Sequence, residues 1–128
     1  MIDHVSFGVA DAERSRVFYQ AALDPLDIVR VMSVPAGDAD GGGAWHGFGR
    51  DGKAVFWIGE GANLASTHIA FAAETRAVVD AFHAAALAAG GRDNGAPGLR
   101  PHYDPNYYGA FVLDPDGNNV EAVCRAAV

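Results

Sequence analysis

Residues 4–7 read HVSF and residues 68–71 read HIAF, so the second copy begins 64 residues after the first in a chain of 128. Each copy places a histidine at the start of a short apolar run, at the corresponding point of its half of the chain. The same shift of 64 residues aligns Phe18 with Phe82. An internal repeat of this length indicates that the chain consists of two copies of one structural unit.

Each half predicts the same order of elements: one strand, one helix and three further strands. Alternating apolar residues predict the first strand of each half, N-caps at Asp11 and Thr75 predict the helix starts, and turn-rich segments separate the later strands. The strands are expected within residues 2–9, 27–34, 44–49, 53–59, 67–72, 92–96, 107–114 and 117–125. The predicted fold is therefore α+β, with two tandem βαβββ modules, about 1–62 and about 65–128, forming one domain over residues 1–128. A cleft is expected between or across the two curved mixed sheets.

Composition and charge narrow the possible partners. Half of the residues are hydrophobic, 20 % are charged, and the net charge is −7 with a single lysine. An acidic, lysine-poor surface repels phosphate backbones and anionic lipids, so neither nucleic acid nor a membrane is expected as a partner. One cysteine excludes an internal disulfide, and no charged segment leads into an apolar run at the N-terminus. We expect a cytoplasmic globular protein.

Three side chains have the chemistry of metal ligands. Alternation places His4 and His68 on strand faces that otherwise carry small residues, and it places Glu121 in a strand whose other residues are mostly apolar. A buried carboxylate needs a partner or a metal. Two imidazoles and one carboxylate from separate strands form the set that holds redox-active or Lewis-acid divalent ions. The alternative is that Glu121 meets an arginine and that the histidines are ordinary hydrogen-bonded core residues.

The segments HVSFGVADAERSRVFYQAAL (4–23), THIAF (67–71) and FVLDPDGNNVEAV (111–123) resemble the vicinal oxygen chelate superfamily, which includes glyoxalases, bleomycin-resistance proteins and extradiol dioxygenases. The resemblance implies a glyoxalase-like fold, places His4, His68 and Glu121 at the metal-ligand positions, and implies a divalent ion (Fe, Mn, Ni or Zn). It also implies a homodimer, in which His4 of one chain can meet His68 and Glu121 of the other. The sequence itself leaves open whether the site is shared in this way or lies within one chain.

Two departures from the family pattern separate this chain from particular members. The position in the first half that corresponds to Glu121 is Phe56 or Trp57, so a fourth, acidic ligand of the glyoxalase type is absent. The tyrosine that extradiol dioxygenases carry ten residues before the glutamate is Phe111 here.

The pocket around these ligands is expected to include polar aromatic residues. Three of the four tyrosines lie in RPHYDPNYYGAF (100–111), just before a strand. Loops on a rigid scaffold commonly supply specificity. The residues expected to line the substrate site are Ser6, Trp57, His102, Tyr103, Tyr107 and Tyr108.

The function that follows is a metal-dependent lyase, isomerase or dioxygenase that chelates neighbouring oxygens of a small molecule. The alternative is a metal-free small-molecule binding protein of the bleomycin-resistance type. No catalytic base is assigned, although His102 and Tyr108 are candidates.

Overall fold

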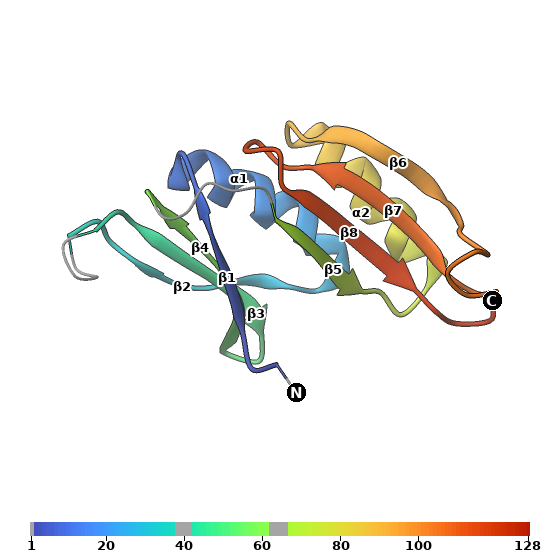
Figure 1. Ribbon diagram of the computed structural model, residues 1–128. Coiled ribbons are helices and arrows are strands. Elements are labelled where there is room, and N and C mark those ends of the chain that lie inside the picture. Colours follow the sequence, from blue (N-terminus) through green and yellow to red (C-terminus); the bar gives the residue numbers. More distant parts are fainter. Residues whose placement is uncertain (1, 38–41, 62–66) are drawn as a thin grey trace.

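The computed structural model describes residues 2–37, 42–61 and 67–128 (Figure 1). Both halves contain the predicted order of elements. The first half consists of β1 (Val5–Val9), α1 (Ala12–Leu23), the short 3₁₀ helix η1 (Asp24–Leu26), β2 (Val29–Val34), β3 (Trp45–Arg50) and β4 (Lys53–Glu60). The second half consists of β5 (His68–Ala72), α2 (Arg76–Ala88), β6 (Arg92–Leu99), β7 (Tyr108–Leu113) and β8 (Asn119–Cys124). The expected boundary between the modules lies within residues 62–66, outside the described residues.

Each half forms its own four-stranded mixed sheet. The strand orders are β1-β4-β3-β2 and β5-β8-β7-β6, so the two sheets have the same topology. In each sheet the first strand of the module runs parallel to the last, and the remaining pairs are antiparallel. The sheets lie next to each other, with α2 behind β7 and β8 (Figure 1). These features confirm the α+β fold of two βαβββ modules.

The predicted helix starts are confirmed by their capping bonds. The Asp11 side chain accepts a hydrogen bond of 3.0 Å from the Arg14 backbone N–H, and the Thr75 hydroxyl accepts one of 3.2 Å from the Val78 N–H. Such caps satisfy backbone donors that have no partner within the helix. No helix among the described residues is long and apolar enough to cross a membrane.

The strands have one face toward the helices and one face away from them. The helix-side faces of both sheets contribute to one apolar core, in which Phe56 of the first module meets Phe71 of the second with ring centroids 5.3 Å apart. Val120, Ala122 and Cys124 face this core, as the alternation in β8 predicted. The outer faces, directed away from the helices, therefore remain available for a site.

The turn between β7 and β8 attaches the second module to the first. Asp114 is buried, and its Oδ2 accepts a 2.6 Å hydrogen bond from the Tyr19 hydroxyl of α1. Asp116 Oδ1 accepts a 3.0 Å bond from the Ala10 backbone N–H, just before α1. The Asp-Pro-Asp-Gly turn thus joins the two modules, and it holds the start of β8, which carries Glu121.

Candidate functional site

The outer face of the second sheet brings two of the three predicted ligands together. Glu121 lies on β8 between Ala70 of β5 and Phe111 of β7, with a relative exposure of only 2 %. Its Oε1 lies 3.2 Å from Nε2 of His68, whose side chain is 50 % exposed. Among the described residues, the buried carboxylate therefore meets a histidine and not the arginine of the alternative interpretation.

Hydrogen bonding determines which nitrogen of His68 faces Glu121. Nδ1 of His68 lies 3.0 Å from the backbone carbonyl oxygen of Asn119, which can only accept a hydrogen bond. Nδ1 therefore carries a hydrogen and donates it. In the neutral imidazole this leaves the electron pair of Nε2 directed at a carboxylate oxygen, so two electron-pair donors face each other. A proton on Nε2 or a cation bound between the two atoms would remove the repulsion between these electron pairs.

Tyr107 completes the surroundings of the carboxylate. Its hydroxyl donates a hydrogen bond to Oε2 of Glu121, on the oxygen that does not face His68. Burial and this hydrogen bond raise the pKa of Tyr107 to about 12, so the phenol is a protonated donor at neutral pH. The guanidinium of Arg125 lies 4.9 Å from the centre of the Tyr107 ring, and the Tyr103 ring lies 5.0 Å from it.

A pocket opens over this group of side chains. Its lining residues are His68, Tyr103, Tyr107, Phe111, Asn119, Glu121 and Arg125. Tyr103 and Tyr107 were predicted as substrate contacts, whereas Phe111, Asn119 and Arg125 were not. The period-two alternation of β7 and β8 was the available signal for Phe111 and Asn119, because both share the face of Glu121.

The other predicted site residues of the first module lie on the other sheet. His4 precedes β1 by one residue, although the alternation had placed it within the strand; its side chain is 56 % exposed, and Nδ1 lies 3.0 Å from Asp3. Ser6 of β1 pairs with Trp57 of β4. Within one chain, Ser6 and Trp57 thus belong to the first sheet and His4 directly precedes it, whereas His68 and Glu121 belong to the second sheet.

The strand register also decides which residue corresponds to Glu121. Glu121 pairs with Ala70, whose counterpart under the 64-residue repeat is Ser6, and Ser6 pairs with Trp57. Trp57, and not Phe56, therefore occupies the corresponding position. The indole of Trp57 has an N–H donor and no electron pair with which to coordinate a metal. The first sheet therefore has no equivalent of the Glu121 carboxylate at this position.

Two indoles cover the outer face of the first sheet. The ring of Trp57 lies against Gly47, where an added Cβ would approach ring atoms to 2.9 Å. The ring of Trp45 lies over Gly59 in the same way. This outer face therefore carries two large aromatic side chains, whereas that of the second sheet carries His68 and Glu121.

His102 and Tyr108 lie apart from the pocket lining. His102 is exposed, and the centroid of its ring lies 4.2 Å from that of Tyr103. The Tyr108 hydroxyl donates a 2.7 Å hydrogen bond to Asp80 of α2, on the helix side of the sheet. This orientation disagrees with the prediction that Tyr108 lines the substrate site, and the reason is that neighbouring residues of a strand point to opposite faces.

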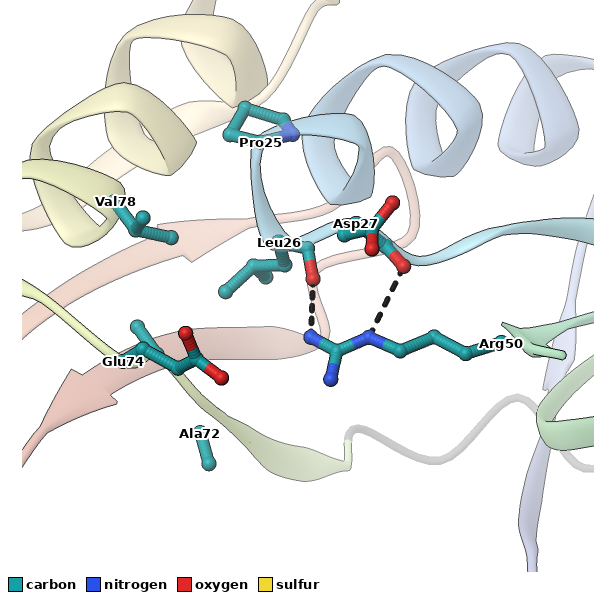
Figure 2. Close-up of a pocket in the computed structure, with 8 residues that line it drawn as sticks. Pro25, Leu26, Asp27, Arg50, Ala72, Glu74 and Val78 are labelled. Carbon is teal, nitrogen blue, oxygen red and sulfur yellow. Dashed lines mark hydrogen bonds between the residues drawn. The ribbon is translucent and has the colours of Figure 1, made fainter.

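Another pocket lies at the junction of the modules, between η1, β3 and the segment that follows β5 (Figure 2). The Arg50 guanidinium donates hydrogen bonds to the backbone carbonyl oxygens of Leu26 and Asp27, the latter at 3.0 Å. These bonds satisfy the carbonyl groups at the end of the 3₁₀ helix, which gives Arg50 a structural role. None of the predicted site residues lines this pocket.

The donor atoms fit part of a metal site. His68 and Glu121 supply one nitrogen and one carboxylate oxygen at adjacent positions, each held by a further hydrogen bond, as ligands of divalent ions commonly are. Across residues 2–37, 42–61 and 67–128 of one chain, no group of three or more His, Cys, Asp or Glu side chains lies close enough to hold a metal ion. A third protein ligand would have to come from elsewhere, such as a second copy.

The chain has structural relatives over its whole length. A protein of Albidiferax ferrireducens T118, described as a glyoxalase/bleomycin resistance protein, is 32 % identical with a TM-score of 0.77, and the match covers 98 % of this chain and 99 % of that one. Glyoxalase I of Zea mays is 24 % identical with a TM-score of 0.71, covering 96 % of this chain and 45 % of that one. Lactoylglutathione lyase of Agrobacterium tumefaciens is 17 % identical with a TM-score of 0.68, covering 97 % and 92 %.

Sequence comparison leads to the same family. No curated protein matches the chain. The family model of the Glyoxalase/Bleomycin resistance protein/Dioxygenase superfamily matches residues 1–122. With a match over nearly the whole chain and a relative that shares both sequence and fold, this protein belongs to the glyoxalase/bleomycin resistance protein/dioxygenase superfamily.

Proposed function

We propose that this protein is a metal-dependent enzyme that binds two neighbouring oxygens of a small-molecule substrate at a divalent ion held by His68, Glu121 and His4. The observation that carries the proposal is the pairing of Nε2 of His68 with Oε1 of Glu121 at 3.2 Å, beside a carboxylate that is almost fully buried. Iron, manganese, nickel and zinc suit such a set of ligands. Bound there, the ion would act as a Lewis acid and stabilise negative charge on the substrate oxygens.

The side chains of this chain would orient the ligands and shape the pocket. The Asn119 carbonyl holds the His68 ring in the tautomer whose Nε2 can bind a cation. The Phe111 ring lies nearly parallel to the same ring, with the two centroids 6.3 Å apart. Tyr103 and Tyr107 add aromatic walls on which a planar substrate can pack.

His4 would come from a second copy of the chain. It directly precedes β1 of the other sheet, and its recorded ion pair is with Asp3, not with His68 or Glu121. A homodimer that joins the first sheet of one copy to the second sheet of the other would unite all three ligands and place Ser6 and Trp57 opposite the pocket. This arrangement uses the same surfaces twice, as a two-fold interface does.

The metal content of protein purified without chelator tests the first part of the proposal. We expect about one ion per chain, because three protein ligands hold one divalent ion and leave open positions on it. The ion should be lost in His68→Ala and in Glu121→Gln. His83→Ala is the matched control, because His83 bonds Asp93 on the surface beside α2, away from the pocket. Metal retained by both ligand variants, or absent from wild type after incubation with each of the four ions, would refute the proposal.

A mixing experiment tests whether the site is shared. The variants His4→Ala and Glu121→Gln each lack both sites of their own homodimer. If the site lies between chains, each mixed dimer regains one intact site, and refolding an equal mixture restores roughly a quarter of the wild-type metal content. If all ligands come from one chain, the mixture restores none.

The second candidate function is metal-free binding of a small molecule. It is favoured by the outer face of the first sheet, where the rings of Trp45 and Trp57 lie against Gly47 and Gly59. Such a face stacks against aromatic compounds and needs no metal. Quenching of tryptophan fluorescence by an aromatic compound, equal in wild type and His68→Ala, would support this function over the first.

A further inference from the structure

The residue directly opposite Glu121 has no hydroxyl, and the hydroxyl that bonds Glu121 comes from Tyr107, just before β7. Phe111 of β7 is the direct cross-strand partner of Glu121, and its ring carries no polar atom. Tyr107 lies four residues earlier on the same face of the chain, and its hydroxyl reaches Oε2 of Glu121. The residue between them on this face is Gly109.

Gly109 provides the space for this contact. A Cβ at position 109 would lie 3.1 Å from Cε1 of Tyr107 and 3.2 Å from Oε2 of Glu121, so it would press on both partners of the hydrogen bond. Gly109 is not among the residues with positive φ, so its backbone conformation is open to other amino acids. The glycine is therefore explained by space rather than by backbone geometry.

The consequence is a carboxylate with two distinct oxygens. Oε2 is occupied by the Tyr107 hydroxyl, while Oε1 faces Nε2 of His68 at 3.2 Å. The Arg125 guanidinium lies over the Tyr107 ring, 4.9 Å from its centre. A buried carboxylate held at one oxygen presents the other in a defined direction.

We propose that Tyr107 is a positioning residue that orients Glu121 toward His68, and that Gly109 is the position that makes this possible. The effect on metal binding rests on the proposed function, whereas the orientation of Glu121 itself does not.

Binding of Co²⁺ alone, followed by visible absorbance and by calorimetry, tests the effect on the metal. We expect Tyr107→Phe to weaken Co²⁺ binding about 10- to 100-fold and to change the absorbance spectrum, as loss of a hydrogen bond to a metal ligand does. Gly109→Ala should act in the same direction. The matched controls are Tyr108→Phe, whose hydroxyl bonds Asp80 on the helix side, and Gly98→Ala, whose Cβ would meet only the tip of Arg100 at 3.3 Å.

A double-mutant cycle in urea, without metal, tests the orientation independently. Tyr107→Phe and Glu121→Gln should be non-additive in their effect on unfolding, because the two side chains are bonded. If wild type binds Co²⁺ and Tyr107→Phe binds it with the same affinity, the positioning role is overturned and the proposed function remains intact. Failure of wild type to bind Co²⁺ would refute the proposed function, and additive effects in the cycle would overturn the positioning role. If Tyr107→Phe does not fold, Gly109→Ala carries the same test.

Discussion

The bond between Tyr19 and Asp114 gives a prediction about how the two modules hold together. Tyr19→Phe removes one hydroxyl from a fully buried side chain and leaves the ring in the core. Asp114 Oδ2 then loses a donor at 2.6 Å but keeps the 2.9 Å bond from Nδ2 of Asn118. Burial and the neighbouring carboxylate raise the pKa of Tyr19 well above its ordinary value, so the phenol is the donor throughout the neutral range.

The size of the effect follows from these contacts. A hydrogen bond to a charged group contributes about 1.5–3 kcal/mol. Because Asp114 retains other donors and no cavity forms, we expect the free energy of unfolding to fall by about 2 kcal/mol. For a domain of this length that corresponds to a decrease in Tm of about 7 °C.

Thermal and urea denaturation at one protein concentration measure the effect. Tyr108→Phe is the matched control, since it removes a hydroxyl that bonds the surface residue Asp80 and should change stability by less than about 1 kcal/mol. Equal stability of Tyr19→Phe and Tyr108→Phe would show that the bond between Tyr19 and Asp114 does not stabilise the contact between the modules.

Three further predictions concern residues that do not line the pocket. Burial lowers the pKa of His46 below its ordinary value, so its contribution to stability is complete above pH about 6.5 and is lost as the pH falls through the lowered pKa. His46→Gln should therefore flatten the decrease in the free energy of unfolding between pH 7 and 5. An unchanged slope would contradict this expectation. Gly47→Ala should destabilise the protein by about 1–3 kcal/mol in urea, because the added Cβ would lie 2.8 Å from Cβ of Ala54 and 2.9 Å from the Trp57 ring; wild-type stability would show that both neighbours move aside without cost. Thr75→Ala should cost about 1 kcal/mol, while Thr75→Ser keeps the cap and most of the stability; equal losses in the two variants would rule out the cap as the cause.

Local patterns in the sequence were sufficient for the elements and their faces. The 64-residue repeat predicted two βαβββ modules, and the period of two predicted that His68 lies on a strand face that otherwise carries small residues. The caps at Asp11 and Thr75 required only the local preference for a side-chain acceptor at a helix start. These features depend on residues close to one another along the chain, which is why they can be read without knowing the packing.

Contacts between distant segments required the tertiary structure. The alternation could not decide between Phe56 and Trp57 as the counterpart of Glu121, because a shift of one residue in register reverses every face of a strand. It also did not separate Tyr107 from Tyr108, of which the first reaches Glu121 and the second bonds Asp80. The three-dimensional arrangement further placed His4 just before the first sheet, whereas Glu121 lies in the second.

By itself, the sequence determined the repeated unit, the fold class and the faces on which the candidate ligands lie. Only the tertiary structure decided that Glu121 pairs with His68 and Tyr107, and that Asp114 joins its module to Tyr19 of the other. The physical reason is that helix and strand periodicity arise from the local backbone, whereas a buried carboxylate is satisfied by whichever donors the packing of distant strands brings within reach.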